Sequence, residues 1–517
     1  MTRETTPLLL PPAPDRRASP RPGDLARLES AETLCGGRFG EEDAAGAGAM
    51  ARQEAAALAG SAAPVALAYL LQFSFNFVNI LSLGHLGASE LAAAALGNMT
   101  LFMLVNAPAV GLASALDTFC ATAFTASRDK TLVGFHLQRG LVAVTLHLLL
   151  VLPVLLGLEP VLVAVGQDPA VSRLCASFVR AQLVGAVPWM YFECVKRFLQ
   201  AQGHMRASTG VLLAVLPLHL ANNYLLVWSP TVGIGFLGAA VANVVTFWAM
   251  FVGSIAYAWH SEARGAWGGW SRRVAASMPE YYRLAIPTMV MTCSDWAAWE
   301  LLAIAASYLG SVPLAAQSIV INTCSLTYQV PAGLSVAVTN RAGNLLGQGR
   351  ARRARVASGT GLLLGAAAGS LNSAFCLAAA AWWGRVYSSD PGVVATVARI
   401  MPICALFQLS DAVNGVSAGV LRSIGRQAAG AWVNFPSYYL LGFPLGLYLT
   451  YGPPAMGVAG LWVGIAAGVT AAAVGQTAIC VRADYDEEVA RCMAQVDKAQ
   501  GLVSSGPDSG GPTHQDA

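Results

Sequence analysis

The sequence has little charge. Only 11% of its 517 residues are Asp, Glu, Lys or Arg, whereas 55% are hydrophobic. Soluble globular proteins carry about 25% charged residues, so the composition excludes that class. The few charges lie in short clusters between long apolar stretches. A bilayer imposes this pattern, because each span needs about 20 apolar residues whose backbone groups are bonded within the helix. The composition therefore predicts an all-α polytopic membrane protein.

The sequence also lacks the usual marks of a metal centre or an enzyme. None of its 10 cysteines shows CxxC spacing. We therefore interpret them as small buried packing residues rather than disulfides or metal ligands. No clustered catalytic set of His and Asp stands out. We predict no enzyme activity, no metal or other cofactor, and no nucleic-acid partner.

Neither end of the sequence contains a long apolar run. Leu8, Leu9 and Leu10 form the only apolar run near the start, and it is too short for a signal peptide. Residues 1–55 are interpreted as a disordered cytosolic tail and residues 483–517 as a polar cytosolic tail. Glu4 precedes Leu8 and Leu9 as in acidic dileucine sorting signals. This spacing fits a vacuolar or lysosomal membrane, and the plasma membrane is the alternative.

What the sequence does contain is about twelve apolar spans. They are Ser61–Gly84, Ala92–Leu116, Leu141–Gly157, Cys175–Phe192, Thr209–Trp228, Phe236–Trp259, Leu284–Leu309, Pro313–Val338, Ala357–Trp383, Ile400–Val420, Ala429–Thr450 and Met456–Ile479. Lys and Arg cluster after the even-numbered spans, whereas the connections after odd-numbered spans are nearly free of them. Because positive charge stays on the cytoplasmic side, both termini are predicted to be cytosolic.

The membrane region repeats at a nearly fixed offset. Leu86-Gly87 recurs as Leu309-Gly310, 223 positions later, and Gly238 recurs as Gly460, 222 positions later. Each repeat holds about six spans, so both halves begin on the same side of the membrane. We therefore predict two parallel six-helix lobes, residues 56–270 and 271–482, around a central cavity suited to alternating access.

Few acids fall well inside the spans, and a carboxyl group in hydrocarbon suggests function because its burial is costly. Asp295, Glu300 and Asp411 have no basic residue within their own spans, so they are the candidate ion-coupling residues. Asp295 and Glu300 are about 140° apart around one helix, so they cannot both face one narrow groove. By contrast, Lys196 and Arg197 follow Glu193 by three and four residues, which favours a helix-end ion pair.

Polar and aromatic residues near these acids are candidates for substrate binding. Trp296 and Trp299 are three residues apart and should share a helix face, where indole rings suit an organic cation. The first span has no acid but carries Gln72, Asn76 and Asn79, so we expect coupling in the second lobe and polar contacts in the first. The candidate substrate-binding set is Gln72, Asn76, Trp296, Trp299, Asn322, Tyr328 and Asn414.

Three further features of the spans have both a structural and a functional interpretation. Asp117, near the cytoplasmic end of its span, fits a structural role as well as a functional one. Pro64 and Pro287 can bend as lobes move, but Pro is also common in membrane helices. His219 is interpreted as a packing residue with its polar atoms bonded, rather than as a proton relay.

Four stretches of the sequence resemble the eukaryotic branch of the multidrug and toxic compound extrusion (MATE) transporters. They are "ALDTFCATAFTA" from Ala115, "SDWAAWE" from Ser294, "VPAGLSVAVTNRAGNLLGQG" from Val330 and "GVLRSIGRQ" from Gly419. The resemblance covers Ser61–Ile479 and implies twelve spans in two lobes and proton-coupled, in some branches sodium-coupled, export of organic cations. It places the family's coupling acids on Asp295, Glu300 and Asp411. A further acid of some animal members falls on Asn322, which cannot titrate.

The residues and the resemblance together predict an antiporter that exports small organic cations or drugs in exchange for protons. It is expected to act as a monomer in the lipid bilayer. The alternative is a flippase for lipids or lipid-linked oligosaccharides, which would need a basic cavity for phosphate. The charge inside these spans is acidic instead.

Overall fold

The computed structural model describes residues 46–84 and 86–504. The chain divides into a unit that ends at Arg52, of which only the start of the first helix is described, and a unit from Gln53 onward. Every regular element of the described residues is a helix. The elements of the first half are α3 (Ala47–Gly84), α4 (Ala88–Leu101), the π-helical turn η1 (Phe102–Asn106), α5 (Ala107–Ala113), α6 (Ala115–Ala126), α7 (Thr131–Leu156), α8 (Leu158–Ala164), α9 (Pro169–Ala201), α10 (Ala207–Trp228), α11 (Phe236–His260) and η2 (Glu262–Ala266).

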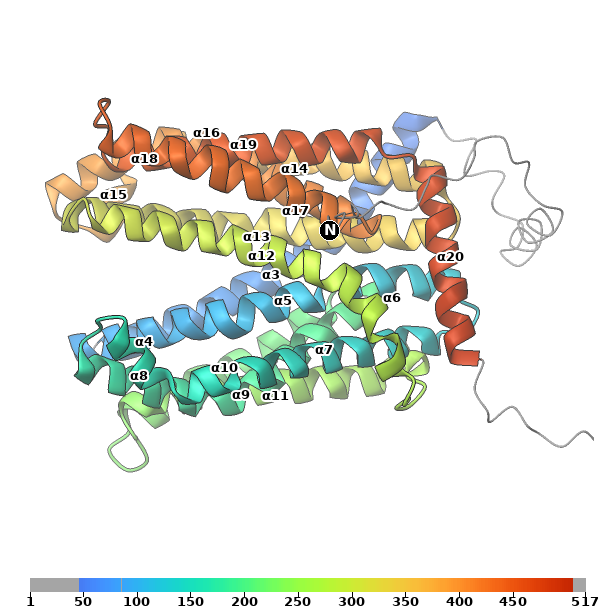
Figure 1. Ribbon diagram of the computed structural model, residues 1–517, viewed down its shortest axis with the longest axis horizontal. Helices are drawn as coiled ribbons and strands as arrows, with labels where there is room; N and C mark the ends of the chain where they lie inside the picture. Colours follow the sequence, from blue (N-terminus) through green and yellow to red (C-terminus); the bar gives the residue numbers. More distant parts are fainter. Residues whose placement is uncertain (1–45, 85, 505–517) are drawn as a thin grey trace, which may run out of the picture. The chain divides into compact units, whose positions relative to one another are not determined.

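The second half repeats this arrangement and adds one helix. Its elements are α12 (Val274–Ser307), α13 (Ser311–Gly347), α14 (Ala351–Ala379), α15 (Trp383–Tyr387), α16 (Pro391–Ser423), α17 (Gln427–Pro436), the π-helical turn η3 (Ser437–Gly442), α18 (Phe443–Tyr451), α19 (Val458–Arg482) and α20 (Tyr485–Ser504). Within the unit from Gln53, helices α4–α11 form a first lobe and α13–α19 a second lobe (Figure 1).

The local structure confirms the internal repeat. Asp168 caps α9 by accepting hydrogen bonds from the second and third backbone N–H groups, and Asp390, 222 positions later, caps α16 in the same way. Gly235 and Gly457, again 222 positions apart, precede α11 and α19 with positive φ angles of 62° and 61°. Glycine suits this backbone region because it has no Cβ. The two halves therefore share the devices that start their helices.

The predicted spans agree with the helices, but their ends do not. Nine helices among the described residues are long and apolar enough to cross a membrane. The other three predicted spans are also helical: α12 and α13 cover two, and Ala429–Thr450 is divided by η3. Several helices extend beyond their apolar stretch. For example, α9 continues to Ala201, past the predicted end at Phe192, because the charged residues in its last turns pair with one another.

The two tails differ in part from the prediction. Residues 1–45, including the dileucine pattern, and residues 505–517 lie outside the described residues. Disorder is a wrong prediction for residues 47–55, which begin α3 and are rich in alanine, the strongest helix former. The predicted polar tail from residue 483 contains the twenty-residue helix α20.

The first helix of each repeat passes from one lobe to the other. On α3, Leu58 joins the core of the second lobe, whereas Phe75 packs in the first. On α12, Tyr281 joins the core of the first lobe, whereas Leu302 packs in the second. The two lobes therefore exchange the initial halves of these helices.

Close backbone packing holds both crossings. A Cβ atom added at Gly333 of α13 would lie 2.7 Å from the Ala66 nitrogen of α3, and one added at Gly111 of α5 would lie 2.4 Å from the Met289 Cα of α12. Ala66 and Met289 are 223 positions apart, so equivalent residues make both contacts.

Candidate functional site

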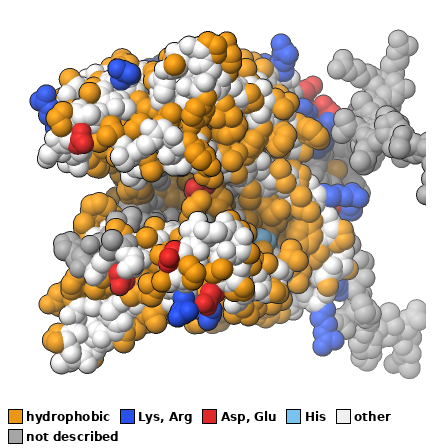
Figure 2. Space-filling view, turned by 60° about the vertical axis from the view of Figure 1, so that its left-hand side comes forward, with side chains coloured by type: hydrophobic (Ala, Val, Ile, Leu, Met, Phe, Trp, Pro, Cys, Tyr) orange, Lys and Arg blue, Asp and Glu red, His pale blue; other side chains and the backbone are white. Residues whose placement is uncertain are grey.

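A cavity of about 380 Å³ lies between the lobes. Figure 2 shows the surface hollowed between the upper and lower groups of helices. Most of the cavity wall comes from α3, α4, η1, α9 and α11 of the first lobe. Glu300 of α12 also lines it, and is the one ionisable side chain among the lining residues that the structure describes. The cavity therefore has a single negative centre.

Amides and aromatic rings form the polar part of the first-lobe wall. The amides are Asn76, Asn98, Asn106, Gln182 and Asn243, and Trp189 and Phe102 are among the rings. Two amides are held by neighbours: Gln182 Nε2 donates to Asn98 Oδ1 at 3.1 Å, and Asn79 Nδ2 donates to Asn243 Oδ1 at 2.6 Å. In each pair the side-chain oxygen of the acceptor amide, Asn98 or Asn243, is used, and its NH₂ group is left to contact a ligand.

The π-helical turn η1 places Phe102, Val105 and Asn106 on the cavity wall. A π turn inserts an extra residue into the helical register, and such turns are frequent at functional sites. Ala107 and Pro108 follow this turn and begin α5. Proline has no backbone N–H, so it cannot donate the hydrogen bond that a continuous α-helix would require at this position. The turn thus presents Asn106 to the cavity next to an otherwise regular helix.

A second polar cluster lies within the second lobe and contains the other two candidate acids. Asn434 of α17 donates to Asp295 Oδ1 at 2.9 Å, and Gln476 of α19 donates to Asn434 Oδ1 at 2.5 Å. Asp411 of α16 lies close enough to interact electrostatically with Asp295. The lobe therefore holds two neighbouring carboxyl groups, one of which is fixed by a chain of buried amides.

The structure confirms that Asp295 and Glu300 face different surroundings. Glu300 lines the cavity toward the first lobe, whereas Asp295 contacts α17 within the second. Within the part of the chain that the structure describes, neither these acids nor Asp411 forms an ion pair. Each can therefore gain or lose a proton without breaking a salt bridge.

The two tryptophans beside these acids have different partners. Trp296 is exposed and meets the Phe102 ring edge-on, with 4.7 Å between centroids. Trp299 packs against Phe407 and Trp462 in the core of the second lobe. The predicted shared face is therefore wrong: a spacing of three residues turns the two side chains about 60° apart around the helix, and only Trp296 reaches the side of the first lobe.

The remaining predicted binding residues are scattered. Asn76 lines the cavity and Asn322 is exposed on α13. Tyr328 lies against Gly415 of α16, one turn beyond Asp411, and Asn414 is buried with its amide 3.4 Å from the Tyr438 hydroxyl. Gln72 is half-buried on α3 and is not part of the cavity wall. The structure thus brings Asn76 to Glu300, and Tyr328 and Asn414 to Asp411.

Sequence reasoning missed most of the amides. Asn98, Asn106, Gln182 and Asn243 line the cavity, and Asn434 and Gln476 support Asp295. The signal was present, because each is an uncharged polar residue inside an apolar helix. The same property had selected only Gln72, Asn76, Asn79, Asn322 and Asn414 among the amides.

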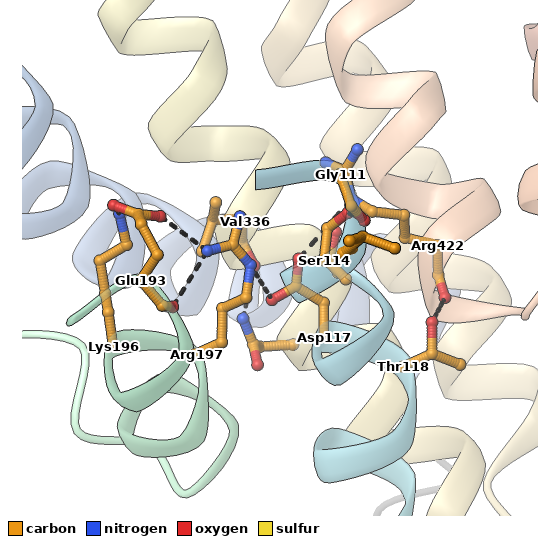
Figure 3. Close-up of polar contacts among 12 residues, drawn as sticks. Gly111, Ser114, Asp117, Thr118, Glu193, Lys196, Arg197, Val336 and Arg422 are labelled. Atoms are coloured by element: carbon orange, nitrogen blue, oxygen red, sulfur yellow. Dashed lines mark hydrogen bonds and ion pairs between the residues drawn. The ribbon is translucent and has the colours of Figure 1, made fainter. Parts of the chain in front are cut away.

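At the end of the molecule that α20 crosses, charged residues join the two lobes (Figure 1 and Figure 3). We call this the closed end; it contains the α6–α7 and α13–α14 turns and α20. Asp117 of α6 lies 3.5 Å from Arg197 Nε of the first lobe and 3.9 Å from Arg422 Nε of the second. Arg197 also bonds Glu193 Oε2 at 2.7 Å, and Glu193 bonds Lys196 at 2.6 Å.

The structure confirms one predicted ion pair and shows the surroundings of Asp117 and His219. Glu193 forms the predicted ion pair with Lys196 and Arg197, and Asp117 belongs to the same network. His219 has both ring nitrogens within hydrogen-bond distance of an oxygen, from Thr246 and the Phe75 carbonyl, as expected for a packing residue.

Two hydrogen bonds strengthen the closed end. Thr118 Oγ1 donates to the Arg422 carbonyl at 2.5 Å, and Thr125 Oγ1 donates to the Asn344 carbonyl at 2.9 Å. Both bonds join α6 of the first lobe to the second lobe. The structure is therefore closed at this end while the cavity holds a free acid on the other side.

Two repeated lobes of long apolar helices around a shared cavity define a class of multi-pass membrane transporters. The MatE family model matches residues 64–225 and again 287–448, two stretches offset by the same 223 positions as the repeat. The chain belongs to the MATE family.

Curated relatives and solved structures agree with this assignment. An uncharacterized transporter of Schizosaccharomyces pombe is 37% identical over 96% of this chain and 91% of its own length. Multidrug and toxin extrusion protein 1 of Oryctolagus cuniculus is 34% identical over 80% of this chain and 72% of its own length. The crystal structure of the eukaryotic MATE transporter AtDTX14 superposes with a TM-score of 0.81 at 26% identity, covering 86% of this chain and all of that one.

Proposed function

We propose that this transporter exports organic cations in exchange for protons by alternating access of its two lobes. The observation that carries the proposal is the position of Glu300, which among the described residues is the single ionisable group on the cavity wall and forms no ion pair. A cation gains Coulombic attraction from such a carboxylate, and the neighbouring Trp296, Trp189 and Phe102 rings can add cation–π attraction.

Proton exchange follows from competition for the same charge. When Glu300 takes up a proton, its charge disappears and the attraction for a bound cation is lost. When the proton leaves toward the other side of the membrane, the site becomes negative again and can bind the next cation. Asp295 and Asp411 form a second place where protons can be held, because two neighbouring carboxyl groups disfavour being charged together.

The proposed orientation places the closed end in the cytosol together with both termini. Lys196, Arg197, Arg422 and Arg426 lie at the closed end, in agreement with the preference of positive charge for the cytoplasmic side. The structure then represents the state in which the cavity faces away from the cytosol. We further propose that the protein acts as a monomer in a vacuolar, lysosomal or plasma membrane.

The cavity does not favour the flippase alternative. Phosphate recognition calls for Lys or Arg, whereas the described lining residues contain one acid and five amides. Neutral donors can assist an anion, but they do not offset the repulsion of Glu300.

The test is exchange in proteoliposomes with an imposed pH gradient and radiolabelled tetraethylammonium as the tracer. Glu300→Gln should abolish gradient-driven uptake, because the amide cannot alternate between charged and neutral forms. Glu90→Gln is the matched control, because Glu90 lies at the start of α4, outside the cavity wall.

Three outcomes of this assay would contradict the proposal. Full uptake by the Glu300→Gln variant would remove the assigned role of the acid. Uptake driven by a sodium gradient but not by a pH gradient would show that sodium, and not the proton, is the coupling ion. Movement of a fluorescent phospholipid, without tetraethylammonium transport, would favour the flippase.

A further inference from the structure

We infer that α20 is a strap across the closed end, and that its C-terminal half must leave the first lobe in each transport cycle. Figure 1 shows α20 crossing the ends of both groups of helices. The inference rests on the proposed alternating access, because it concerns how the closed end opens.

The sequence of α20 explains why it forms a helix with one apolar face. Asp484 Oδ1 accepts the backbone N–H groups of Asp486 and Glu487, which caps the N-terminus. Three acids in the first turn suit the positive end of the helix dipole. Tyr485, Val489, Cys492, Val496 and Ala499 recur at alternating spacings of four and three, which places them on one face.

The N-terminal half of α20 is anchored to the second lobe. Tyr485 and Cys492 are buried in the core of that lobe. Glu488 is almost fully buried and forms an ion pair with Arg426, which follows α16. Only Ala483 and Asp484 separate α20 from α19, so this half moves with the second lobe.

The C-terminal half is anchored to the first lobe. Val496 and Ala499 are buried in the first-lobe core. Lys498 Nζ lies 3.2 Å from Glu280 Oε1, on the half of α12 that packs against the first lobe. Gln500 Nε2 donates to Ser127 Oγ, directly after α6, at 2.6 Å. One rigid helix thus holds two bodies that alternating access requires to separate at this end.

The half on the first lobe is the one that can be released. The contacts described for it include two small apolar side chains, a solvent-accessible ion pair and a neutral hydrogen bond, and none of these is a buried ion pair. Exposed ion pairs contribute little to stability. The half on the second lobe has a buried ion pair and a short covalent link to α19. Opening of the closed end should therefore detach residues 496–500 and leave residues 485–492 in place.

Cross-linking separates the two halves experimentally. Ser127→Cys with Gln500→Cys would be bridged by a short bifunctional methanethiosulfonate and assayed for tetraethylammonium exchange. Linked protein should lose at least tenfold in exchange rate and recover after reduction. In the matched pair Arg426→Cys with Glu488→Cys, which joins α20 to the second lobe, linkage should leave the rate of that variant unchanged. If protein linked at positions 127 and 500 exchanges tetraethylammonium at an undiminished rate, the C-terminal half of α20 does not need to leave the first lobe, and the proposal is wrong.

Cys492 supplies a readout that does not depend on the transported substrate. It lies at the end of the half that is anchored to the second lobe, close enough to Thr122 of the first lobe for the two side chains to interact, and burial raises the pKa of its thiol to about 12. A thiol held protonated and buried reacts slowly with alkylating reagents. Lys498→Glu, which sets a like charge against Glu280, should raise alkylation of Cys492 about tenfold, as measured by mass spectrometry of its peptide.

Lys498→Arg keeps the charge and should preserve the protection of Cys492. Equal alkylation of Cys492 in both Lys498 variants would contradict the strap even if the protein carried a different substrate. Conversely, increased alkylation in the Lys498→Glu variant, together with failure of tetraethylammonium exchange, would retain the strap and refute the proposed substrate.

Discussion

Individual carboxyl groups in this protein fall into two kinds. Glu193 and Asp117 are held by Lys and Arg at the closed end, and their loss would leave buried charges without partners. Glu300, Asp295 and Asp411 form no ion pair with any described residue. The first kind joins helices and lobes, whereas the second can change its charge without breaking an ion pair.

The amide chain beside Asp295 gives a prediction at this scale. Asn434→Leu removes the donor to Asp295, and a hydrogen bond to a charged group contributes about 1.5–3 kcal/mol. We expect exchange to fall by roughly ten- to a hundredfold. The measurement is tetraethylammonium exchange in a double-mutant cycle with Asp295→Asn. If Asn434 acts through Asp295, the second substitution should add little to the first; full additivity would show that the two act independently.

Sequence alone found the acids but not their surroundings. Asp295, Glu300 and Asp411 stood out because no base lies within their own spans, which is a property of the chain itself. The contacts of Asn434 and Gln476 with Asp295 depend on three helices that are distant in sequence. The different partners of Trp296 and Trp299 likewise depend on which helix meets each side of α12.

At the scale of helices, α3 and α12 are distinguished by crossing between the lobes. Pro64 and Pro287 lie within these helices next to the close contacts of Ala66 and Met289. Proline removes one backbone hydrogen bond from a helix and permits a bend. Their positions 223 residues apart place a weak point in each crossing helix, at the place where it changes lobes.

Close packing of α6 on α13 predicts how the closed end can be forced open. A Cβ atom at Gly347 would lie 2.6 Å from the Thr122 carbonyl oxygen. Gly347→Val should therefore penalise the closed arrangement by about 1–3 kcal/mol. In a Thr118→Cys background, labelling of the new thiol should rise about tenfold, since Thr118 is buried at the same junction.

Gly359→Val is the control for this experiment, because a Cβ there meets open space on α14. Equal labelling of the Thr118→Cys thiol in the two valine variants would mean that the contact between α6 and α13 does not hold the closed end.

Elements were easier to predict than their limits. The length of each apolar stretch predicts a span, because the thickness of the hydrocarbon layer fixes that length. The extensions of α9 and α13 beyond their apolar stretches depend instead on polar partners at the closed end. The apolar face of α20 is present in the sequence as apolar residues spaced three and four apart. The stretch was nevertheless predicted to be a polar tail, because most of its residues are polar.

For the molecule as a whole, α3 and α12 connect the lobes, because the initial half of each helix packs in the opposite lobe. Glu54 of α3 is fully buried and accepts two hydrogen bonds from Arg341 of α13, at 2.7 and 2.8 Å, and one from Arg353 of α14, at 2.6 Å. The second lobe thus holds the beginning of the first repeat.

Loss of this carboxylate should weaken the protein as a whole. Glu54→Ala leaves two arginines without their shared partner, and breaking a buried ion pair costs about 3 kcal/mol. We expect a lower melting temperature in detergent, measured by tryptophan fluorescence. Glu262→Ala, at an exposed position in η2, should leave the melting temperature unchanged. A melting temperature of the Glu54→Ala variant within error of the control would show that this contact does not stabilise the fold.

The global plan followed from the sequence because a repeat of about 223 residues constrains both halves at once. The first lobe has no acid in its opening span, and its cavity wall is built of amides and rings, as predicted. The crossing of α3 and α12 was not predictable, because each crossing half is apolar enough to pack on either lobe.

The burial of Glu54 also restricts how the chain can be made. Arg341 is synthesised 287 residues after Glu54. While the ribosome produces that interval, the beginning of α3 has none of its final neighbours from α13 and α14. A nascent chain that has completed only its first six helices must therefore shelter one acidic side chain until the second half emerges from the translocon.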